Sequence, residues 1–167
     1  GPIDSYVDDN GSIIPVTKAN LDKQFVLFMV GSTFWGTEIS GDGTQQKPLW
    51  TNPNLGAIEN DIVRFHILSV GPGHTFHLHA HRWLKTGTNT VIDTKLLDEG
   101  SDTHTFTIKA GSGVGAGDWQ YRCHLFAHME AGMHGSFRVD PMGGSGVSIA
   151  GASPYGRILL GTKDEPG

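Results

Sequence analysis

The chain has 167 residues, a formal net charge of −5, and 37% hydrophobic but only 17% charged residues. That length is enough for one domain with a hydrophobic core, and the absence of a Lys/Arg cluster or a long apolar run argues against nucleic acid or membrane as a partner. A single cysteine excludes an internal disulfide framework, and 24 glycines favour an all-β protein.

The expected elements are short, apolar or alternating segments separated by turn residues. Residues 1–23 are polar and turn-rich and are predicted to be an N-terminal extension to a domain at 24–140. Strands are predicted at 24–30, 61–70, 74–81, 90–94, 103–109, 118–123 and 135–140. Residues 36–60 are rich in Gly, Pro, Asn and Thr and are expected to be a long excursion. Residues 141–167 are expected to be a Gly/Ser-rich tail, a linker with a short docking segment.

One stretch carries an unusual set of side chains. The only cysteine, Cys123, is followed five residues later by His128 and five residues after that by Met133. A thiolate, an imidazole and a thioether are soft ligands, and with a second histidine they form the trigonal site with a weak axial Met that holds blue copper. The second histidine is expected to be His74, which begins the densest histidine run. Met133 argues against zinc, which prefers four ligands without a thioether.

Strand geometry divides the histidines into two groups, because side chains alternate faces along a strand. His74 shares its face with Phe76 and Leu78, whereas His77, His79 and His81 point the other way. Around the cysteine, Cys123 shares its face with Trp119 and Tyr121, whereas Arg122 and His124 are on the opposite face. We therefore expect one metal site inside the sandwich and a second histidine group outside, joined by the Cys123–His124 peptide.

These patterns resemble a known family. His-x-x-His-x-His-x-His at 74–81 and Cys-His-x₃-His-x₃-Gly-Met at 123–133 are similar to the last cupredoxin domain of multicopper oxidases, in particular of small two-domain bacterial laccase-like enzymes. The resemblance covers roughly residues 24–140 and implies a cupredoxin-like Greek-key β-sandwich that binds copper. By position it assigns type 1 ligands to His74, Cys123, His128 and Met133, a type 2 ligand to His77, and type 3 ligands to His79 and His124.

The chain departs from the family at one position. Members have His-Cys-His where this chain has Arg122-Cys-His, and a guanidinium cannot bind metal. The family's other half-cluster, two His-x-His motifs from an amino-terminal domain, does not occur in these 167 residues. The outer group is therefore expected to be either a working half-site or a vestigial one. Ala80 replaces a glycine usual in the family, which we expect to matter little.

The resemblance implies the type 1 copper domain of a laccase-like oxidase. Single electrons from a reducing small molecule or metal ion would pass through Cys123 and His124 to a dioxygen-reducing cluster shared with a second cupredoxin domain or a second copy of the chain. The alternative is a non-enzymatic electron carrier with a vestigial interface. Copper nitrite reductase is disfavoured because it needs a ligand at position 122. The family also implies a secreted or periplasmic location.

The remaining histidines are expected to have ordinary roles. His81 is predicted to hydrogen-bond near the ligands without binding metal. His66 and His104 are predicted to be sheet histidines without particular partners, and His134 to be exposed at the mouth of the copper site.

Overall fold

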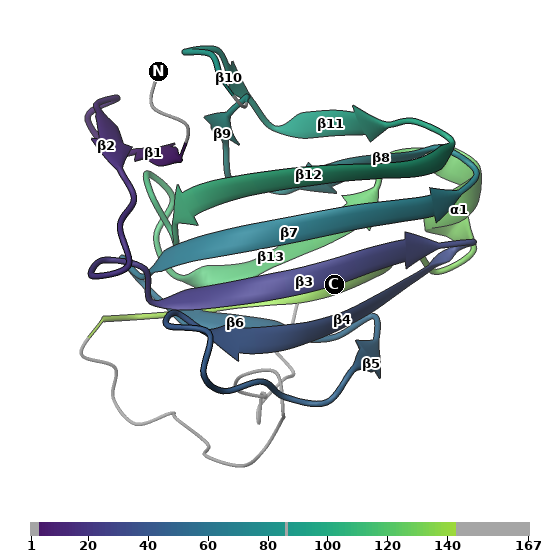
Figure 1. The fold of residues 1–167 in the computed structure, drawn as a ribbon, viewed down its shortest axis with the longest axis horizontal. Helices are drawn as coiled ribbons and strands as arrows, with labels where there is room; N and C mark the ends of the chain where they lie inside the picture. Colours follow the sequence, from purple (N-terminus) through teal and green to yellow (C-terminus); the bar gives the residue numbers. More distant parts are fainter. Residues whose placement is uncertain (1–3, 86, 143–167) are drawn as a thin grey trace.

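Two five-stranded sheets pack face to face as a sandwich in the computed structural model, which describes residues 4–85 and 87–142 (Figure 1). The β7 sheet has the order β12 (Gly100–Lys109), β7 (Ile62–Gly71), β3 (Lys23–Val30), β4 (Thr33–Ser40) and β5 (Trp50–Thr51). The β13 sheet has the order β11 (Thr94–Leu97), β8 (His74–Leu78), β13 (Gly117–Cys123), β14 (His134–Asp140) and β6 (Leu55–Ile58). Two small hairpins, β1 (Ser5–Val7) with β2 (Ile13–Pro15) and β9 (Trp83–Leu84) with β10 (Val91–Ile92), flank the sandwich. The predicted all-β Greek-key sandwich is confirmed.

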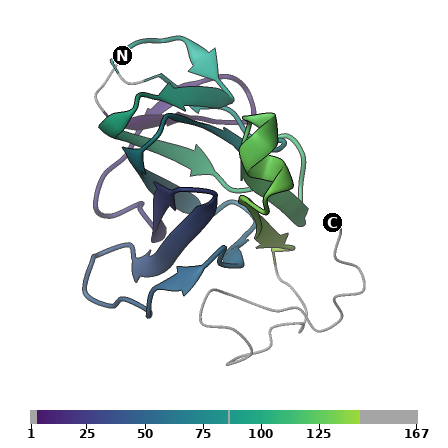
Figure 2. The same cartoon turned by 90° about the vertical axis from the view of Figure 1, so that its right-hand side faces the viewer.

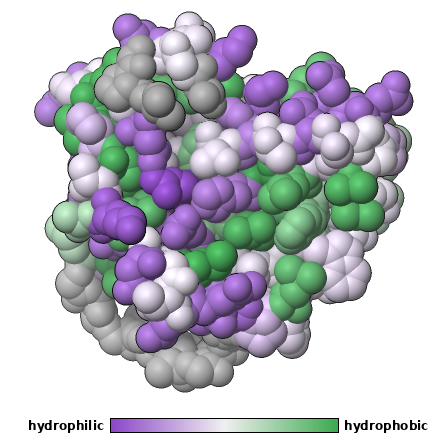
Figure 3. Space-filling model, viewed as in Figure 1, coloured by the Kyte–Doolittle hydropathy of each residue, from purple (hydrophilic) through white to green (hydrophobic). Residues whose placement is uncertain are grey.

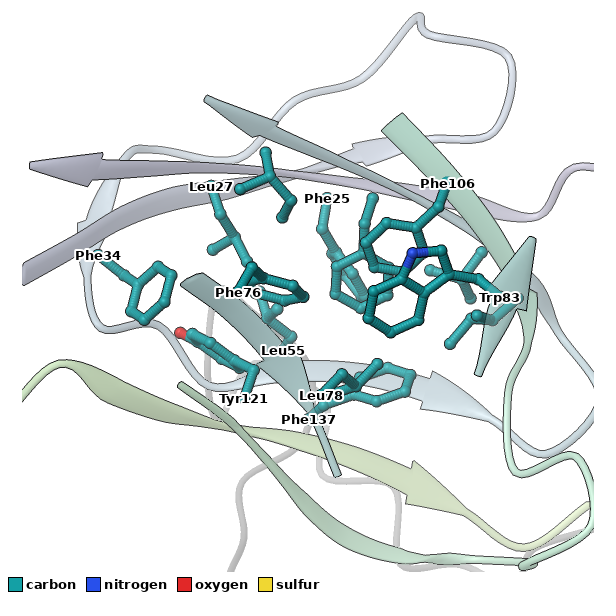
Figure 4. Packing of buried hydrophobic residues seen from close by; sticks show 14 of the residues in the cluster. Phe25, Leu27, Phe34, Leu55, Phe76, Leu78, Trp83, Phe106, Tyr121 and Phe137 are labelled. Atoms are coloured by element: carbon teal, nitrogen blue, oxygen red, sulfur yellow. The ribbon is translucent and has the colours of Figure 1, made fainter. Parts of the chain in front are cut away.

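Alternation along the strands builds the core between the sheets. On β3, Phe25, Leu27 and Met29 are fully buried, and the residues between them are not. Aromatic side chains fill much of the interior (Figure 4), and Trp83 stacks on Phe106 with ring centroids 4.0 Å apart. Such pairs add about 1 kcal/mol each beyond the area that they bury. This packing makes the space between the sheets a closely packed apolar core.

The expected excursion at 36–60 is wrong in part, because three stretches of it belong to strands of the two sheets. β4 pairs with β3 along its whole length, and β5 and β6 follow in the same stretch. Gly36 lies so close to its neighbours that a Cβ atom would come within 2.6 Å of Leu27 Cδ2. Glu38 is buried, and its Oε1 lies 3.3 Å from Lys23 Nζ and 3.6 Å from Lys47 Nζ. A glycine and an acid that would be unfavourable in an average strand are here required by packing and ion pairing.

The described part of the predicted N-terminal extension is tied to the sandwich. Asp4 forms an ion pair with Arg64 and accepts a hydrogen bond from the Thr107 hydroxyl at 3.0 Å. Asp9 lies 3.4 Å from Lys109 Nζ and accepts a hydrogen bond from the Ser112 hydroxyl. The expected tail, apart from residues 141 and 142, lies outside the described residues.

The outer faces of the two sheets differ in polarity. On the β7 sheet, Phe28 lies opposite Leu68 on one side and Trp35 on the other, and Val30 lies opposite Val70. Figure 3 views this face, and its hydrophobic residues gather over one half. The outer face of the β13 sheet instead carries histidines, arginines and amides. The candidate functional residues lie on both faces of this sheet.

Candidate metal centre

Four of the predicted ligands lie at one end of the sandwich. His74 begins β8 and Cys123 ends the antiparallel neighbour β13, while His128 lies on α1 (Phe126–Glu130) and Met133 directly precedes β14. Figure 2 shows α1 at this end, against the edge where the strands stop. The His124 N–H donates to the Thr75 carbonyl at 2.7 Å and thereby fixes the end of β13 against β8.

Backbone hydrogen bonds close the ligand loop on itself. The Cys123 N–H donates to the Met133 carbonyl at 3.2 Å, and the Met133 N–H donates to the His128 carbonyl at 3.1 Å. The one-turn helix α1 between them was not foreseen from the sequence. It forms over residues of good helix propensity, and Gly132, at φ 104°, turns the chain after it. Cys123, His128 and Met133 are therefore fixed relative to one another.

The donor atoms of His74, Cys123 and His128 converge on one point. Cys123 Sγ lies 3.9 Å from His74 Nδ1 and 3.5 Å from His128 Nδ1. The three donor atoms lie within 4.8 Å of one another, and no other group of three His, Cys, Asp or Glu residues does so in residues 4–85 and 87–142. His74, Cys123 and Met133 are fully buried, whereas His128 is partly exposed. One imidazole edge of this inner group therefore reaches solvent.

The environment of His74 suits a metal ligand. Burial lowers the pKa of His74, and the nearby His128 lowers it further. The imidazole is therefore neutral near pH 7 and keeps a lone pair on one ring nitrogen. Its Nε2 atom is buried without a hydrogen-bond partner among the described residues. A buried thiol, two imidazole Nδ1 atoms and a buried thioether on the same loop fit a soft, redox-active metal such as copper.

The outer group lies on the opposite face of the same strands. The ring centroid of His77 is 5.0 Å from that of His79 and 5.4 Å from that of His124. His77 Nδ1 donates to the Asp93 carbonyl at 2.9 Å, so its Nε2 carries the lone pair. Their donor atoms do not converge as closely as those of the inner group.

Arg122 forms a hydrogen bond with one ring nitrogen of His79. The Arg122 Nε–H donates to His79 Nε2 at 3.2 Å. The pKa of His79 is lowered by burial first, and then by the electrostatic effect of His77 and of the Arg122 guanidinium. A metal ion here would meet a fixed positive charge and one ligand nitrogen already engaged.

His134 joins the outer group, contrary to the expected position at the mouth of the copper site. Arg122 lies directly opposite His77 on β8 and directly opposite His134 on β14. Residues opposite one another in a sheet point to the same face, so the exposed His134 shares the face of Arg122. The register of β13 with β14 was needed to see this, and the sequence does not fix it.

The sequence predicted that His81 shares the face of His77 and His79, but the alternation stops before His81. Strand β8 ends at Leu78, and Ala80 has φ 67°, a conformation that costs a non-glycine residue about 1 kcal/mol or more. The chain turns there and buries His81. Its Nδ1–H donates to the His79 carbonyl at 3.0 Å, and its Nε2 accepts from the Gly111 N–H at 3.0 Å. His81 thus holds the backbone of His79, directly after β8, in place.

The other two histidines have partners that the sequence did not reveal. His66 Nε2 lies 2.8 Å from Gln24 Oε1 on the outer face of the β7 sheet. His104 Nε2 accepts from the Trp83 indole N–H at 2.9 Å inside the core. Burial lowers the pKa of His104 to about 4, which keeps it neutral as an acceptor.

A sequence relative shares this region. The chain is 36% identical over 129 residues to a "probable nitrite reductase-hydroxylamine oxidoreductase fusion protein" of Kuenenia stuttgartiensis. The match covers 71% of this chain but only 15% of that protein.

No helix in the described residues has the length and apolar character needed to cross a membrane.

Solved structures share the fold. A multicopper oxidase has a TM-score of 0.51 and 20% identity over 72% of this chain and 45% of its own. The McoA multicopper oxidase of Aquifex aeolicus has a TM-score of 0.52 and 14% identity over 77% of this chain and 31% of its own. A blue copper oxidase of Nitrosomonas europaea has a TM-score of 0.50 and 13% identity over 75% and 46%. The chain thus spans less than half the length of these three proteins.

A family model described as multicopper oxidase matches residues 21–143, which is most of the chain. The fold of the chain is cupredoxin-like. The family uses copper, and the inner group offers a fitting set of donors for that metal. The chain therefore belongs to the multicopper oxidase family.

Proposed function

We propose that this domain is a one-copper electron-transfer module, with a type 1 site made by His74, Cys123, His128 and Met133. The observation that supports this most strongly is the convergence of Cys123 Sγ with the Nδ1 atoms of His74 and His128, all within 4.8 Å of one another. Copper, when bound, takes up and releases a single electron.

The protein residues prepare that site. Cys123 offers a thiolate once a metal displaces its proton, and the buried neutral His74 offers its lone pair without first losing a proton. Met133 provides a weak soft donor from the same loop. The apolar surroundings exclude water, and the hydrogen bonds of the loop hold the donors in place, so little rearrangement is needed.

A reducing substrate would approach His128. Of the two histidines in the inner group, His74 is fully buried and His128 is partly exposed. Leu125 and Phe126, on the same loop, are exposed at 41% and 68%. An apolar rim around an accessible imidazole suits a small aromatic reductant or the surface of a redox partner better than a strongly hydrated ion.

The electron would leave the site on the side opposite His128, at the outer face of the β13 sheet. Cys123 is buried, but the next residue, His124, is exposed on the outer face of the β13 sheet. One peptide bond therefore joins the inner donor group to the outer surface. An acceptor bound at that surface would lie close to the thiolate.

The bond between Arg122 and His79 favours a carrier over half of a working oxidase. It engages a nitrogen that a cluster would need, and the guanidinium supplies no ligand. The laccase-like oxidase is the second candidate, favoured by the retention of His77, His79 and His124 and requiring a second cupredoxin domain or a second copy. For a nitrite reductase, Arg122 is again an obstacle, since it cannot bind a second copper.

The relative from Kuenenia supports a module within a larger redox protein, because its name describes a fusion and the chain covers 15% of it. We infer that the reductant is a small molecule or the surface of a redox partner, that the acceptor is another redox domain, and that the protein is secreted or periplasmic.

The deciding experiment is copper content per chain together with optical and electron spin resonance spectra and oxygen uptake. We expect one copper, an intense visible thiolate band, a single type 1 signal and negligible oxygen uptake. A second copper signal with rapid oxygen uptake would overturn the carrier and support the oxidase. A colourless protein that binds no copper would refute both.

A further inference from the structure

Two arginines on the outer face of the β13 sheet have opposite surroundings. Arg138 Nη1 lies 2.9 Å from Asp118 Oδ2, and Arg138 Nε lies 3.3 Å from Asp140 Oδ1. Arg122, on the adjacent strand, has no carboxylate within ion-pair distance among the described residues and is bonded to His79. Both are partly buried. The positive charge of Arg138 is therefore compensated, and that of Arg122 is not.

The bond to His79 leaves one edge of the Arg122 guanidinium available. Nε is directed to His79 Nε2, so the group is held in orientation through that nitrogen. The two Nη atoms form the remaining edge, which has the spacing of the two oxygens of a planar oxyanion. A partly buried cation without a counter-charge is unfavourable, so an anion at this edge gains both charge and geometry.

Hydrogen-bonding side chains lie on the same face of the β13 sheet as Arg122 and around its cross-strand neighbour. The exposed His134 is the cross-strand neighbour of Arg122, and it forms part of a hollow of about 270 Å³ on the same face. Asn52 and Gln120 also line the hollow, and Asn52 Oδ1 already accepts from the Phe34 N–H, which leaves its amide N–H groups as donors. The one carboxylate in the lining, that of Asp118, is paired with Arg138 and accepts from Ser136. Arg122 does not itself line the hollow, but its neighbour His134 does, and the lining adds hydrogen-bond donors without an uncompensated carboxylate.

We propose that Arg122 and His134 form a binding site for a small planar oxyanion of the carboxylate type. Arg122 supplies the charge and a two-point contact, and His134 with the neighbouring amides supplies further donors. In this reading, the arginine that prevents a family metal cluster gives the outer face a different ligand. The site needs no bound copper, so it stands or fails independently of the proposed electron transfer.

The test is a titration of the ¹⁵N-labelled full chain with sodium formate and, separately, sodium nitrite, at constant ionic strength maintained with sodium chloride. We expect saturable shifts of the Arg122 Nε–H resonance and of amides near His134. Arg122→Gln should weaken binding at least roughly tenfold, since the charge-assisted two-point contact is lost. Arg82→Gln removes an exposed arginine from another part of the surface and should leave the affinity unchanged.

Arg122→Lys separates charge from geometry. It keeps the positive charge but not the planar fork, and its affinity should fall between those of the parent and Arg122→Gln. The amide spectrum of each variant reports whether it is folded, and Arg122→Lys carries the test if Arg122→Gln is not. Shifts that grow linearly without saturation, or equal affinity in the parent, Arg122→Gln and Arg122→Lys, would overturn the proposal.

Discussion

The inner and outer histidine groups lie on the two faces of the same strands, but only one has the geometry of a metal site. Cys123 Sγ and two imidazole nitrogens converge within 4.8 Å in the inner group. In the outer group, His79 Nε2 accepts a hydrogen bond from Arg122 instead. The inner donors are mostly buried, whereas His77 and His79 are partly exposed and His124 is exposed.

The difference shows that histidine number alone does not make a metal site. Burial lowers the pKa of His74 and so keeps it neutral, and backbone hydrogen bonds hold the loop that carries Cys123, His128 and Met133. On the outer face, one substituted position brings a permanent charge next to three imidazoles. Coulomb repulsion at such short range opposes a second cation.

The largest effect should come from removing the inner thiol. Cys123→Ser should abolish the intense visible band of the copper-loaded protein, since a hydroxyl cannot supply the thiolate that causes it. His124→Ala changes the adjacent outer residue and should keep the band. Optical spectra after copper loading decide this, and colour that persists in Cys123→Ser would mean that the inner group is not the copper site.

Metal-linked stability should separate the two groups next. Copper that binds the native state stabilises it by about 4 kcal/mol when free copper is a thousand times the dissociation constant. His74→Ala should lose most of this gain, whereas His77→Ala should keep it. Melting curves with and without copper test the comparison, and equal losses in both variants would contradict it.

His104 lies outside both groups and shows how burial of a histidine affects the pH dependence of stability. The folded pKa of His104, about 4, is below its ordinary value of 6.5, mainly because it is buried. The unfolded chain then binds more protons between these values, so stability is complete above pH 6.5 and falls as the pH drops towards 4, by up to about 3 kcal/mol.

His104→Gln should flatten this pH dependence, because glutamine can accept from the Trp83 indole and does not titrate. Urea unfolding at several pH values from 4 to 7 measures the effect. An unchanged slope in the variant would show that other groups cause the acid sensitivity.

Arg122→His should make the outer group more like the inner group in its affinity for copper. It restores the His-Cys-His pattern, removes a positive charge and frees His79 Nε2, so affinity for a second copper should rise about tenfold or more, equivalent to at least about 1.4 kcal/mol. Arg122→Gln removes the charge without adding a ligand and should give a smaller gain. Equilibrium dialysis measures both, and equal affinities in all three proteins would show that Arg122 does not limit the site.

The smallest effect concerns the turn that removes His81 from the outer group. Ala80→Gly should stabilise the protein by about 1 kcal/mol, because glycine adopts positive φ without strain. Ala131, at φ −79°, is a control at which glycine should give no gain. Thermal melting is the measurement, and a loss of stability in Ala80→Gly would show that the alanine side chain contributes more than its backbone costs.

Much of this arrangement could be read from the sequence, because period-two alternation is a local property. It separates His74 from His77 and Cys123 from Arg122, and the structure has the same division of burial. The spacing of Cys123, His128 and Met133 predicted a converging loop, and the donor atoms of the first two do lie close together.

The features that sequence reasoning missed depend on contacts between distant residues. His134 faces Arg122 only through the register of two strands, and His81 is buried because one alanine adopts a left-handed conformation. Strand β4 contains a glycine and a buried glutamate that depend on Leu27 and two lysines. No local pattern contains those partners.

The position of Cys123 as the last residue of β13 has a kinetic consequence. Its buried side chain leads towards His128 at the end of the sandwich, while the following residue leads to the broad side of the β13 sheet. A donor and an acceptor can then bind at the same time on separate surfaces, without exchanging places. Under the proposed electron transfer, such a domain would work as a relay within a ternary complex, and its turnover would not require one partner to leave before the other arrives.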